Sequence, residues 1–296
     1  MGSDDAHVPV LLAETLELLA VRPGGLWVDG TVGLGGHAAA ILRASAPDGR
    51  LLGLDRDGET LARARSALAS FGERVQLEAA DFREIPERLG GERADGILLD
   101  LGLSSAQLDD PARGFSFQAE GPLDMRFDRR SGMTAGELVN RLDEKALADI
   151  IHGYGEEPAA RRIARAIVRA RERARILTTT ELAAIVRRAA PRSRRRGLHP
   201  ATRTFQALRI RVNRELEGLG PAIERAAACL RPGGRVTVIA FHSLEDRAVK
   251  DVFRRLGASG FRVLTRKPTR PSETEVRANP RARSARLRAL AREEAA

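Results

Sequence analysis

The chain has 296 residues, 43% of them hydrophobic, which is enough for one large domain or two modest ones that fold without disulfides or metal ions. A single cysteine, Cys229, excludes a disulfide-rich secreted scaffold and favours a cytoplasmic location. The net charge of +10 favours a polyanionic partner, and no apolar run is long enough to predict a membrane span, so we expect no membrane partner.

The first hundred residues alternate between strand and helix patterns. We predict strands over 27–31, 51–55, 75–79 and 96–100, and helices over 36–44 and 58–70. This alternation is typical of a parallel sheet with helices on both faces. The α/β class is therefore expected for this part of the chain.

A glycine-rich turn follows the first predicted strand. Gly33-Leu34-Gly35-Gly36-His37 leads from that strand into a helix, and the second strand ends in Asp55, 22 positions after Gly33. Glycines let a ligand approach the backbone, and a carboxylate at this spacing can accept the hydroxyl groups of a ribose. The pattern predicts a nucleoside-binding site.

Two cofactors fit this turn. Residues 33–38 satisfy the G-x-G-x-x-A pattern of nicotinamide-dependent dehydrogenases, which therefore stay an alternative. Carboxylates at three successive strand ends, Asp29, Asp55 and Asp81, instead favour S-adenosyl-L-methionine, because its amino-acid end and its sulfonium are positively charged. Phe82 adds an aromatic edge where an adenine would lie. Asp29 or Asp81, taken alone, could be an ordinary helix N-cap.

The fourth predicted strand ends at Asp100, where the reactive methyl group would lie. Methylation of carbon five of a pyrimidine requires a cysteine nucleophile, and Cys229 lies at the end of an apolar helix, where we expect a buried structural thiol. An exocyclic amine needs only alignment and a hydrogen-bond acceptor. Asp100 is the candidate for that acceptor and positioning residue, and cofactor orientation or turn capping are its alternative roles.

Two further groups of residues are interpreted as structural. Ser243 and Asp246 follow the predicted strand over 236–241 and have the spacing of a helix cap rather than of a hydrolase site. The five histidines lie far apart, without the spacing of metal ligands, so no metal site is expected.

The strand patterns stop at Pro111 and resume after Arg214. Between them, Thr134 with Glu137 and Thr178 with Glu181 have the capping-box spacing of helix starts. A further helix over 220–230 precedes the apolar strand. We therefore expect a discontinuous sheet domain, residues 1–110 and 215–296, interrupted by a helical domain, residues 111–214.

The insertion carries the excess positive charge. It contains 23 Lys and Arg against 11 Asp and Glu, so the remainder of the chain is close to neutral. Arg162, Arg165, Arg169 and Arg173 recur on one helical face, whereas Ile163, Ile167 and Ala174 mark another. A charge run is usually a solvated helix face, but its concentration in one insertion favours contacts with phosphate. The candidates for RNA binding are Arg162, Arg165 and Arg169, with Arg194, Arg195 and Arg196 in a basic loop.

Motifs across nearly the whole chain point to one family. They are His7-Val8-Pro9-Val10-Leu11, Asp29-Gly30-Thr31 through Gly35-Gly36-His37, Asp100-Leu101-Gly102-Leu103-Ser104-Ser105 with Gln107-Leu108-Asp109, Gly114-Phe115-Ser116-Phe117, Gly121-Pro122-Leu123-Asp124-Met125-Arg126, and the runs 199–209, 241–247 and 279–284. On these motifs the chain resembles the ribosomal RNA small subunit methyltransferase H family, also called MraW.

The resemblance implies a class I, Rossmann-like S-adenosylmethionine-dependent methyltransferase sheet with an inserted all-helical domain. It also implies N4-methylation of a cytidine in the decoding region of 16S ribosomal RNA, within the small ribosomal subunit. The cofactor contacts that it implies are Gly35, Gly36, His37, Asp55, Phe82, Asp100 and Gln107. The residue pattern adds Asp29 and Asp81 to that set.

Alternatives remain at this level. The family lacks the Asp-Pro-Pro-Tyr motif of many amino-methyltransferases, and the equivalent place reads Asp100-Leu101-Gly102-Leu103, so the cofactor site is better defined than the proton acceptor. An RNA-binding factor that keeps the fold without turnover is a third candidate beside the methyltransferase and the dehydrogenase. A homodimer is compatible with the sequence, which does not determine the oligomeric state.

Overall fold

The computed structural model describes residues 9–190 and 199–294. The chain divides into two compact units, the first formed by Met1–Gly102 with Gly218–Ala296 and the second by Leu103–Glu217. Each unit encloses its own cluster of buried hydrophobic side chains. The second unit is thus a continuous insertion into the first.

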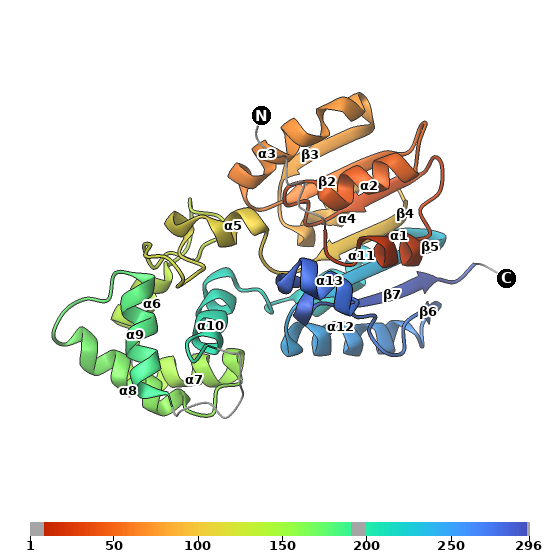
Figure 1. Ribbon diagram of the computed structural model, residues 1–296. Coiled ribbons are helices and arrows are strands. Elements are labelled where there is room, and N and C mark those ends of the chain that lie inside the picture. Colours follow the sequence, from red (N-terminus) through yellow and green to blue (C-terminus); the bar gives the residue numbers. More distant parts are fainter. Residues whose placement is uncertain (1–8, 191–198, 295–296) are drawn as a thin grey trace. The chain divides into compact units, whose positions relative to one another are not determined.

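The first unit is an α/β structure (Figure 1). Its strands are β1 (Leu26–Asp29), β2 (Arg50–Asp55), β3 (Val75–Ala79), β4 (Ala94–Asp100), β5 (Leu230–Ala240), β6 (Phe261–Val263) and β7 (Arg286–Arg292). Its α-helices are α1 (Leu12–Leu19), α2 (Gly36–Ala44), α3 (Gly58–Leu68), α4 (Ile85–Leu89), α11 (Leu219–Ala228), α12 (Ser243–Leu256) and α13 (Glu273–Ala278). Short 3-10 turns cover Ala69–Arg74 (η1), Phe82–Glu84 (η2) and Pro280–Ser284 (η4).

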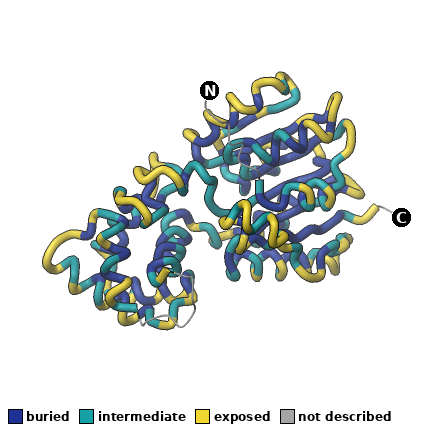
Figure 2. Tube along the Cα trace, in the orientation of Figure 1, coloured by how far each residue is buried: buried dark blue, intermediate teal, exposed yellow. Residues whose placement is uncertain are grey.

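All seven strands form one sheet in the order β3-β2-β1-β4-β5-β7-β6. The pairs from β3 through to β5 are parallel, whereas β7 pairs antiparallel with both β5 and β6. The strands β1, β2, β4 and β5 are mostly buried (Figure 2), as expected for a sheet covered by helices on its faces. The α/β class and the Rossmann-like order are confirmed.

The sequence patterns located the central elements closely. The predicted helix over 36–44 is α2, and each of the four predicted strands in the first hundred residues overlaps a strand of the sheet. Residues 231–234 interrupt the ladder between β4 and β5, because Leu230 pairs with Ala94 and the pairing resumes at Arg235 with Gly96. The strands β6 and β7 were not predicted.

The second unit is helical. Its α-helices are α5 (Ser105–Asp109), α6 (Ala135–Arg141), α7 (Glu144–Gly155), α8 (Ala160–Arg171), α9 (Thr179–Ala189) and α10 (Thr202–Asn213), and Pro111–Arg113 is a 3-10 turn (η3). Within its described residues the only β pairing is an isolated bridge between Pro122 and Thr178. Both predicted capping boxes are present, at the starts of α6 and α9.

The boundaries of the second unit differ from the expected residues 111–214. Segment 103–110 belongs to the helical unit, because Leu103 and Leu108 pack against its hydrophobic core rather than that of the sheet. The unit also extends past Arg214 to Glu217.

Helix α8 is shorter than its arginine pattern suggested. It ends at Arg171, so that Arg173 and Ala174 lie beyond it, and Ala174 is exposed rather than on a buried face. The cause is Asn140 of α6, whose side chain accepts a hydrogen bond from the backbone N–H of Ile176 and donates one to its carbonyl. These contacts draw the chain away from the helical path.

Among the described residues, no helix is long and apolar enough to cross a membrane.

Candidate active site

The candidate active site lies in the first unit, at the carboxyl ends of β1, β2 and β4. The strands β2 and β3 lie on one side of β1, and the strands β4 and β5 lie on its other side, so the strand order reverses next to β1. Ligands of such sheets bind beside the carboxyl ends of the strands at this reversal. The turn after β1 therefore occupies the expected ligand position.

The turn is attached to β4 by two hydrogen bonds. The backbone N–H of Gly30 donates to the Leu98 carbonyl over 2.9 Å, and the backbone N–H of Asp100 donates to the Thr31 hydroxyl over 2.6 Å. The Thr31 side chain thus joins the end of β1 to the residue that was predicted to face the methyl group. The sequence analysis missed this role, because the sequence around Thr31 does not indicate which strand its hydroxyl contacts.

The turn is attached to β2 through Asp55. One Asp55 oxygen, Oδ2, accepts from the Gly33 backbone N–H over 2.8 Å, and Oδ1 accepts from the Asp57 backbone N–H over 2.8 Å. The Val32 N–H also donates to the Leu54 carbonyl. Asp55 therefore holds the turn in shape, and the lone pairs that remain on its oxygens can still accept ribose hydroxyls.

The glycines at the start of α2 are needed for packing within the protein. Gly35 has a φ of 87°, which disfavours any residue with a side chain, and a Cβ there would lie 3.2 Å from Leu68. A Cβ on Gly36 would lie 2.5 Å from Pro9 Cγ. His37 follows in the first turn of α2, buried, with Nε2 3.6 Å from Asp100 Oδ2.

The site concentrates buried carboxyl groups. Burial raises the pKa of Asp29 to about 7, and the neighbouring Asp55 adds to the effect. Burial also raises the pKa of Asp55, and that of Asp100 lies well above its usual range because of burial and the charges of Asp29 and Glu245. Among the described residues, Asp29 Oδ2 and Asp100 Oδ1 are buried without a hydrogen-bond partner. Such oxygens are suited to a cation.

Glu245 was missed as a member of this acidic group. It is 2% exposed, and its Oε2 accepts from the Phe241 backbone N–H over 2.9 Å. It also completes a capping box with His242, which is the N-cap of α12. The interpretation of Ser243 and Asp246 as the cap was wrong by one residue, because the chain enters the helix directly after His242.

The Asp246 carboxylate pairs instead with two arginines of β7. Its oxygens lie 3.1 Å from Arg286 Nη1 and 2.7 Å from Arg288 Nε. Asp246 therefore joins α12 to the antiparallel strand that the sequence analysis did not predict.

Asp81 and Phe82 follow β3. Asp81 is the N-cap of η2 in a capping box with Glu84, and its carboxylate pairs with Arg83 over 2.8 Å and with Arg56 over 3.2 Å. Phe82 is buried, with the Arg83 guanidinium 4.9 Å from its ring centre. A Cβ on Gly30 would lie 2.9 Å from Phe82 Cβ. Asp81 thus has a structural role as a helix N-cap and ion-pair partner, whereas Phe82 lies beside the turn after β1.

Gln107 belongs to the helical unit. It is 5% exposed, its backbone N–H donates to the Ser104 side chain, and its amide oxygen accepts from the Ser104 N–H over 3.0 Å. It therefore forms the capping box of α5, a role that the sequence analysis did not assign.

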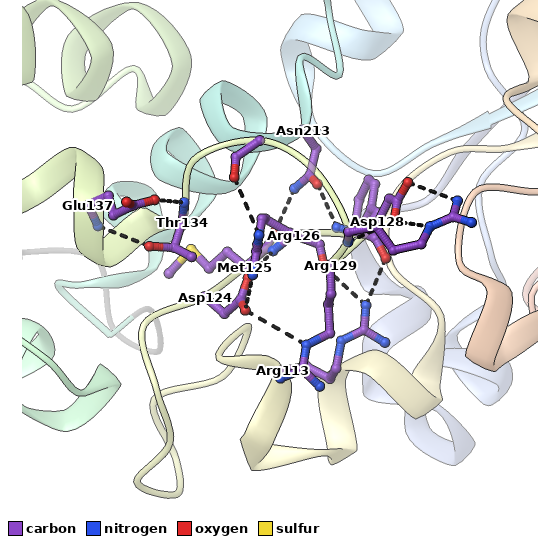
Figure 3. A network of polar contacts seen from close by, with 12 residues as sticks. Arg113, Asp124, Met125, Arg126, Asp128, Arg129, Thr134, Glu137 and Asn213 are labelled. Carbon is purple, nitrogen blue, oxygen red and sulfur yellow. Dashed lines mark hydrogen bonds and ion pairs between the residues drawn. The ribbon is translucent and has the colours of Figure 1, made fainter.

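A network of polar contacts fixes the loop that carries the Gly121–Arg126 motif (Figure 3). Asn213 donates to the Met125 carbonyl and accepts from the Phe127 N–H, both over 2.7 Å. Asp124 forms a two-point ion pair with Arg126. Met125 is buried with a φ of 63°, a strained conformation that these contacts maintain. The motif thus defines a rigid loop of the helical unit.

The predicted RNA-binding arginines of α8 are exposed. Arg165 lies 3.3 Å from Glu144, so part of its charge is neutralised, while Arg162 and Arg169 have no ion pair with any described residue. Arg194, Arg195 and Arg196 lie outside the described residues.

Cys229 lies far along the sheet from the acidic group. It follows α11 and its carbonyl accepts from the N–H of Ala94, the first residue of β4, whereas Asp100 is the last. Its Sγ contacts the Arg225 carbonyl, and burial raises the pKa of the thiol. Cys229 is partly exposed rather than buried as expected, and its distance along β4 from Asp100 fits a structural thiol.

Comparison with known proteins identifies the family. A sequence model of the MraW methylase family matches residues 4–293. Two proteins named ribosomal RNA small subunit methyltransferase H are similar: one from Symbiobacterium thermophilum is 52% identical over 96% of each chain, and one from a Cyanothece species is 55% identical over 95% of this chain and 93% of its own. A solved rRNA methylase from Streptococcus thermophilus covers 98% of this chain and 100% of its own, at 12% identity and a TM-score of 0.46. The match over almost the entire sequence shows that the chain belongs to the MraW methylase family.

Proposed function

We propose that the protein transfers a methyl group from S-adenosyl-L-methionine to the exocyclic N4 of a cytidine in small-subunit ribosomal RNA. The observation that carries the proposal is the group of desolvated carboxyls at the sheet reversal, with buried oxygens of Asp29 and Asp100 that no described residue satisfies. A pyrophosphate would be repelled there, which disfavours the nicotinamide alternative.

The residues present fit the cofactor. A buried carboxylate of raised pKa gains stability from a nearby cation, so Asp29 suits the ammonium of the amino-acid end. Asp55 suits the ribose hydroxyls, and Phe82 lines the place of the adenine. Gly35 and Gly36 keep the backbone of the turn in the required conformation, while His37 supports Asp100 from the first turn of α2. When bound, the cofactor supplies an electrophilic methyl group on a sulfonium.

The choice of a nitrogen target is supported by the position of Cys229. A pyrimidine C5-methyltransferase needs a thiol that adds to the ring, and the chain has one cysteine, whose neighbours lie at the start of β4 rather than its end. An exocyclic amine needs no covalent intermediate. Alignment and electrostatics then supply the rate enhancement.

Asp100 is the proposed proton acceptor. Its backbone N–H donates to the Thr31 hydroxyl, and its Oδ2 lies 3.6 Å from His37 Nε2. Asp100 would accept the surplus proton of the amine once the nitrogen has been methylated. A raised pKa makes this carboxylate a stronger proton acceptor than an ordinary aspartate.

The substrate is proposed from two sources. Relatives more than 50% identical are named as methyltransferases of small-subunit ribosomal RNA. The segment 111–214 has 23 basic against 11 acidic residues, which suits a polyanion.

The test is methyl transfer from labelled S-adenosylmethionine to small ribosomal subunits, followed by mass spectrometry of the nucleosides. We expect N4-methylcytidine from the wild type and a kcat about 100-fold lower from Asp100→Asn, measured at saturating S-adenosylmethionine because Asp100 is also an expected cofactor contact. Label on carbon five or on ribose would refute the proposal. RNA binding without any transfer would instead support the non-catalytic alternative.

A further inference from the structure

An open cavity of about 450 Å³ lies in the helical unit, and none of the arginines that were predicted to bind RNA lines it. Its lining residues are Asn140, Arg141, Arg171, Glu172 and Arg175. Three guanidinium groups and one carboxylate leave a net positive lining. The volume is within the range of cavities that hold small organic ligands.

The walls of the cavity are held together by hydrogen bonds. The Asn140 amide donates to the carbonyls of Gly136 and Ile176, each over 2.7 Å, and its oxygen accepts from the Ile176 N–H over 3.1 Å. Arg171 Nη1 donates to the Val139 carbonyl over 2.7 Å. These bonds join the end of α6 to the end of α8 and to the segment after it, so the cavity forms before any ligand binds.

The charges of two of the arginines have an ordinary explanation. Arg141 and Arg171 lie in the last turns of α6 and α8, where a cation interacts favourably with the helix dipole. Arg141 also lies 3.4 Å from Glu137, but that pair is largely solvated, since the arginine side chain is 64% exposed.

Arg175 is not explained in this way. It lies beyond the end of α8, is exposed, and has no hydrogen bond or ion pair with any described residue. The single carboxylate of the lining, Glu172, does not balance the charge of three arginines. A ligand with a compact negative charge would reverse that balance, because a guanidinium binds phosphate through paired N–H donors.

We propose that this cavity binds backbone phosphate of the RNA substrate, with Arg141 and Arg175 as the mobile donors and Arg171 as the fixed one. The inference rests on the proposed function for the identity of the polyanion. It places the phosphate contact between α6 and α8, whereas Arg165 on the predicted face is already paired with Glu144.

The test is the double variant Arg141→Glu with Arg175→Glu, and Arg171 stays intact because it supports the wall. The matched control is Arg63→Glu with Arg254→Glu, which changes the net charge equally at exposed helix positions of the first unit. Affinity for isolated small ribosomal subunits is measured over a salt series. We expect the cavity variant to bind at least tenfold more weakly. The slope of its log binding constant against log salt concentration should fall in magnitude by about 1.5, whereas the control keeps the wild-type slope.

Steady-state methylation kinetics distinguish a failure of this inference from a failure of the proposed function. The cavity variant is expected to raise KM for the subunits while kcat and S-adenosylmethionine affinity stay as in the wild type. If the wild type methylates and the cavity variant matches the control in KM and slope, the cavity inference fails alone. If the wild type methylates no subunit RNA, the proposed function fails, while the binding series still tests the cavity.

Two further measurements keep the result interpretable. The single variant Arg175→Gln removes a side chain without a described partner, so it leaves folding intact and is expected to lower the slope by about half as much. Poly-glutamate binding is measured in parallel. A cavity variant that loses affinity for poly-glutamate but not for the subunits would assign the cavity to an acidic protein and overturn the proposal.

Discussion

Cofactor affinity is expected to depend on pH through Asp29. The pKa of this carboxyl is about 7, because the side chain is 1% exposed and close to Asp55. A cationic ammonium binds the ionised form. Raising the pH through 7 therefore increases affinity, and lowering it protonates the group and weakens binding.

The size of the effect follows from the ionised fraction. With a pKa of about 7, Asp29 is about half ionised at pH 7 and about 3% ionised at pH 5.5, so the apparent Kd rises about 16-fold over that interval. This range stays below the titration of the ligand's own amine. Binding at pH 7 should also release about half a proton per site, because the cation draws Asp29 into its charged form.

Isothermal titration calorimetry with S-adenosylhomocysteine, in buffers of different ionisation enthalpy, measures both quantities. Asp29→Asn keeps the oxygen that accepts from the Thr31 N–H but cannot ionise. It should bind more weakly and with a smaller slope between pH 5.5 and 7, because Asp55 and Asp100, whose pKa values are also raised, remain in the site. A wild-type Kd that does not change with pH, or the same slope in Asp29→Asn, would refute the reasoning.

The same variant provides a check on stability. A carboxyl whose pKa is raised from 3.8 to about 7 destabilises the fold as the pH rises through that window, by about 4 kcal/mol once it is fully ionised. Without ligand, Asp29→Asn should therefore be more stable than the wild type at pH 8 and similar to it at pH 3.5. Equal melting temperatures at pH 8 would contradict the assigned burial cost.

Three substitutions test the supports of the two units by urea unfolding. Thr31→Val removes the hydroxyl that accepts from the Asp100 N–H and should cost about 1–2 kcal/mol, whereas Thr31→Ser should be close to wild type; equal losses would contradict the role of the hydroxyl. Asn213→Ala leaves the Met125 carbonyl and the Phe127 N–H unsatisfied and should cost about 3 kcal/mol; a loss under about 1 kcal/mol would mean that water replaces the amide. Gly35→Ala should cost about 1–2 kcal/mol, because its φ of 87° disfavours a side chain, and an unchanged midpoint would show that the turn relaxes.

Local patterns were most reliable where the chemistry is local. Alternating strand and helix signals located β1 to β4 and α2, and the Thr-x-x-Glu spacing located the starts of α6 and α9, because a capping box depends only on residues three apart. The end of α8 was misplaced, since Asn140, distant in sequence, determines where that helix stops.

The same distinction applies to the site. Asp29, Asp55 and Asp100 could be proposed from the sequence, because the ends of parallel strands meet at one edge of a sheet. Thr31 and Glu245 could not, because their contacts, Asp100 and Phe241, depend on which strands become neighbours and where α12 begins.

By itself, the sequence determined the α/β class, the helical insertion with its positive charge, and the glycine turn with its acidic strand ends. These follow from periodicity, composition and spacing along the chain. Only the tertiary structure decided that buried oxygens of Asp29 and Asp100 lack partners among the described residues, and that three arginines line a cavity beside α6 and α8. The physical reason is that burial, pKa and charge balance depend on neighbours distant in sequence, which no local pattern records.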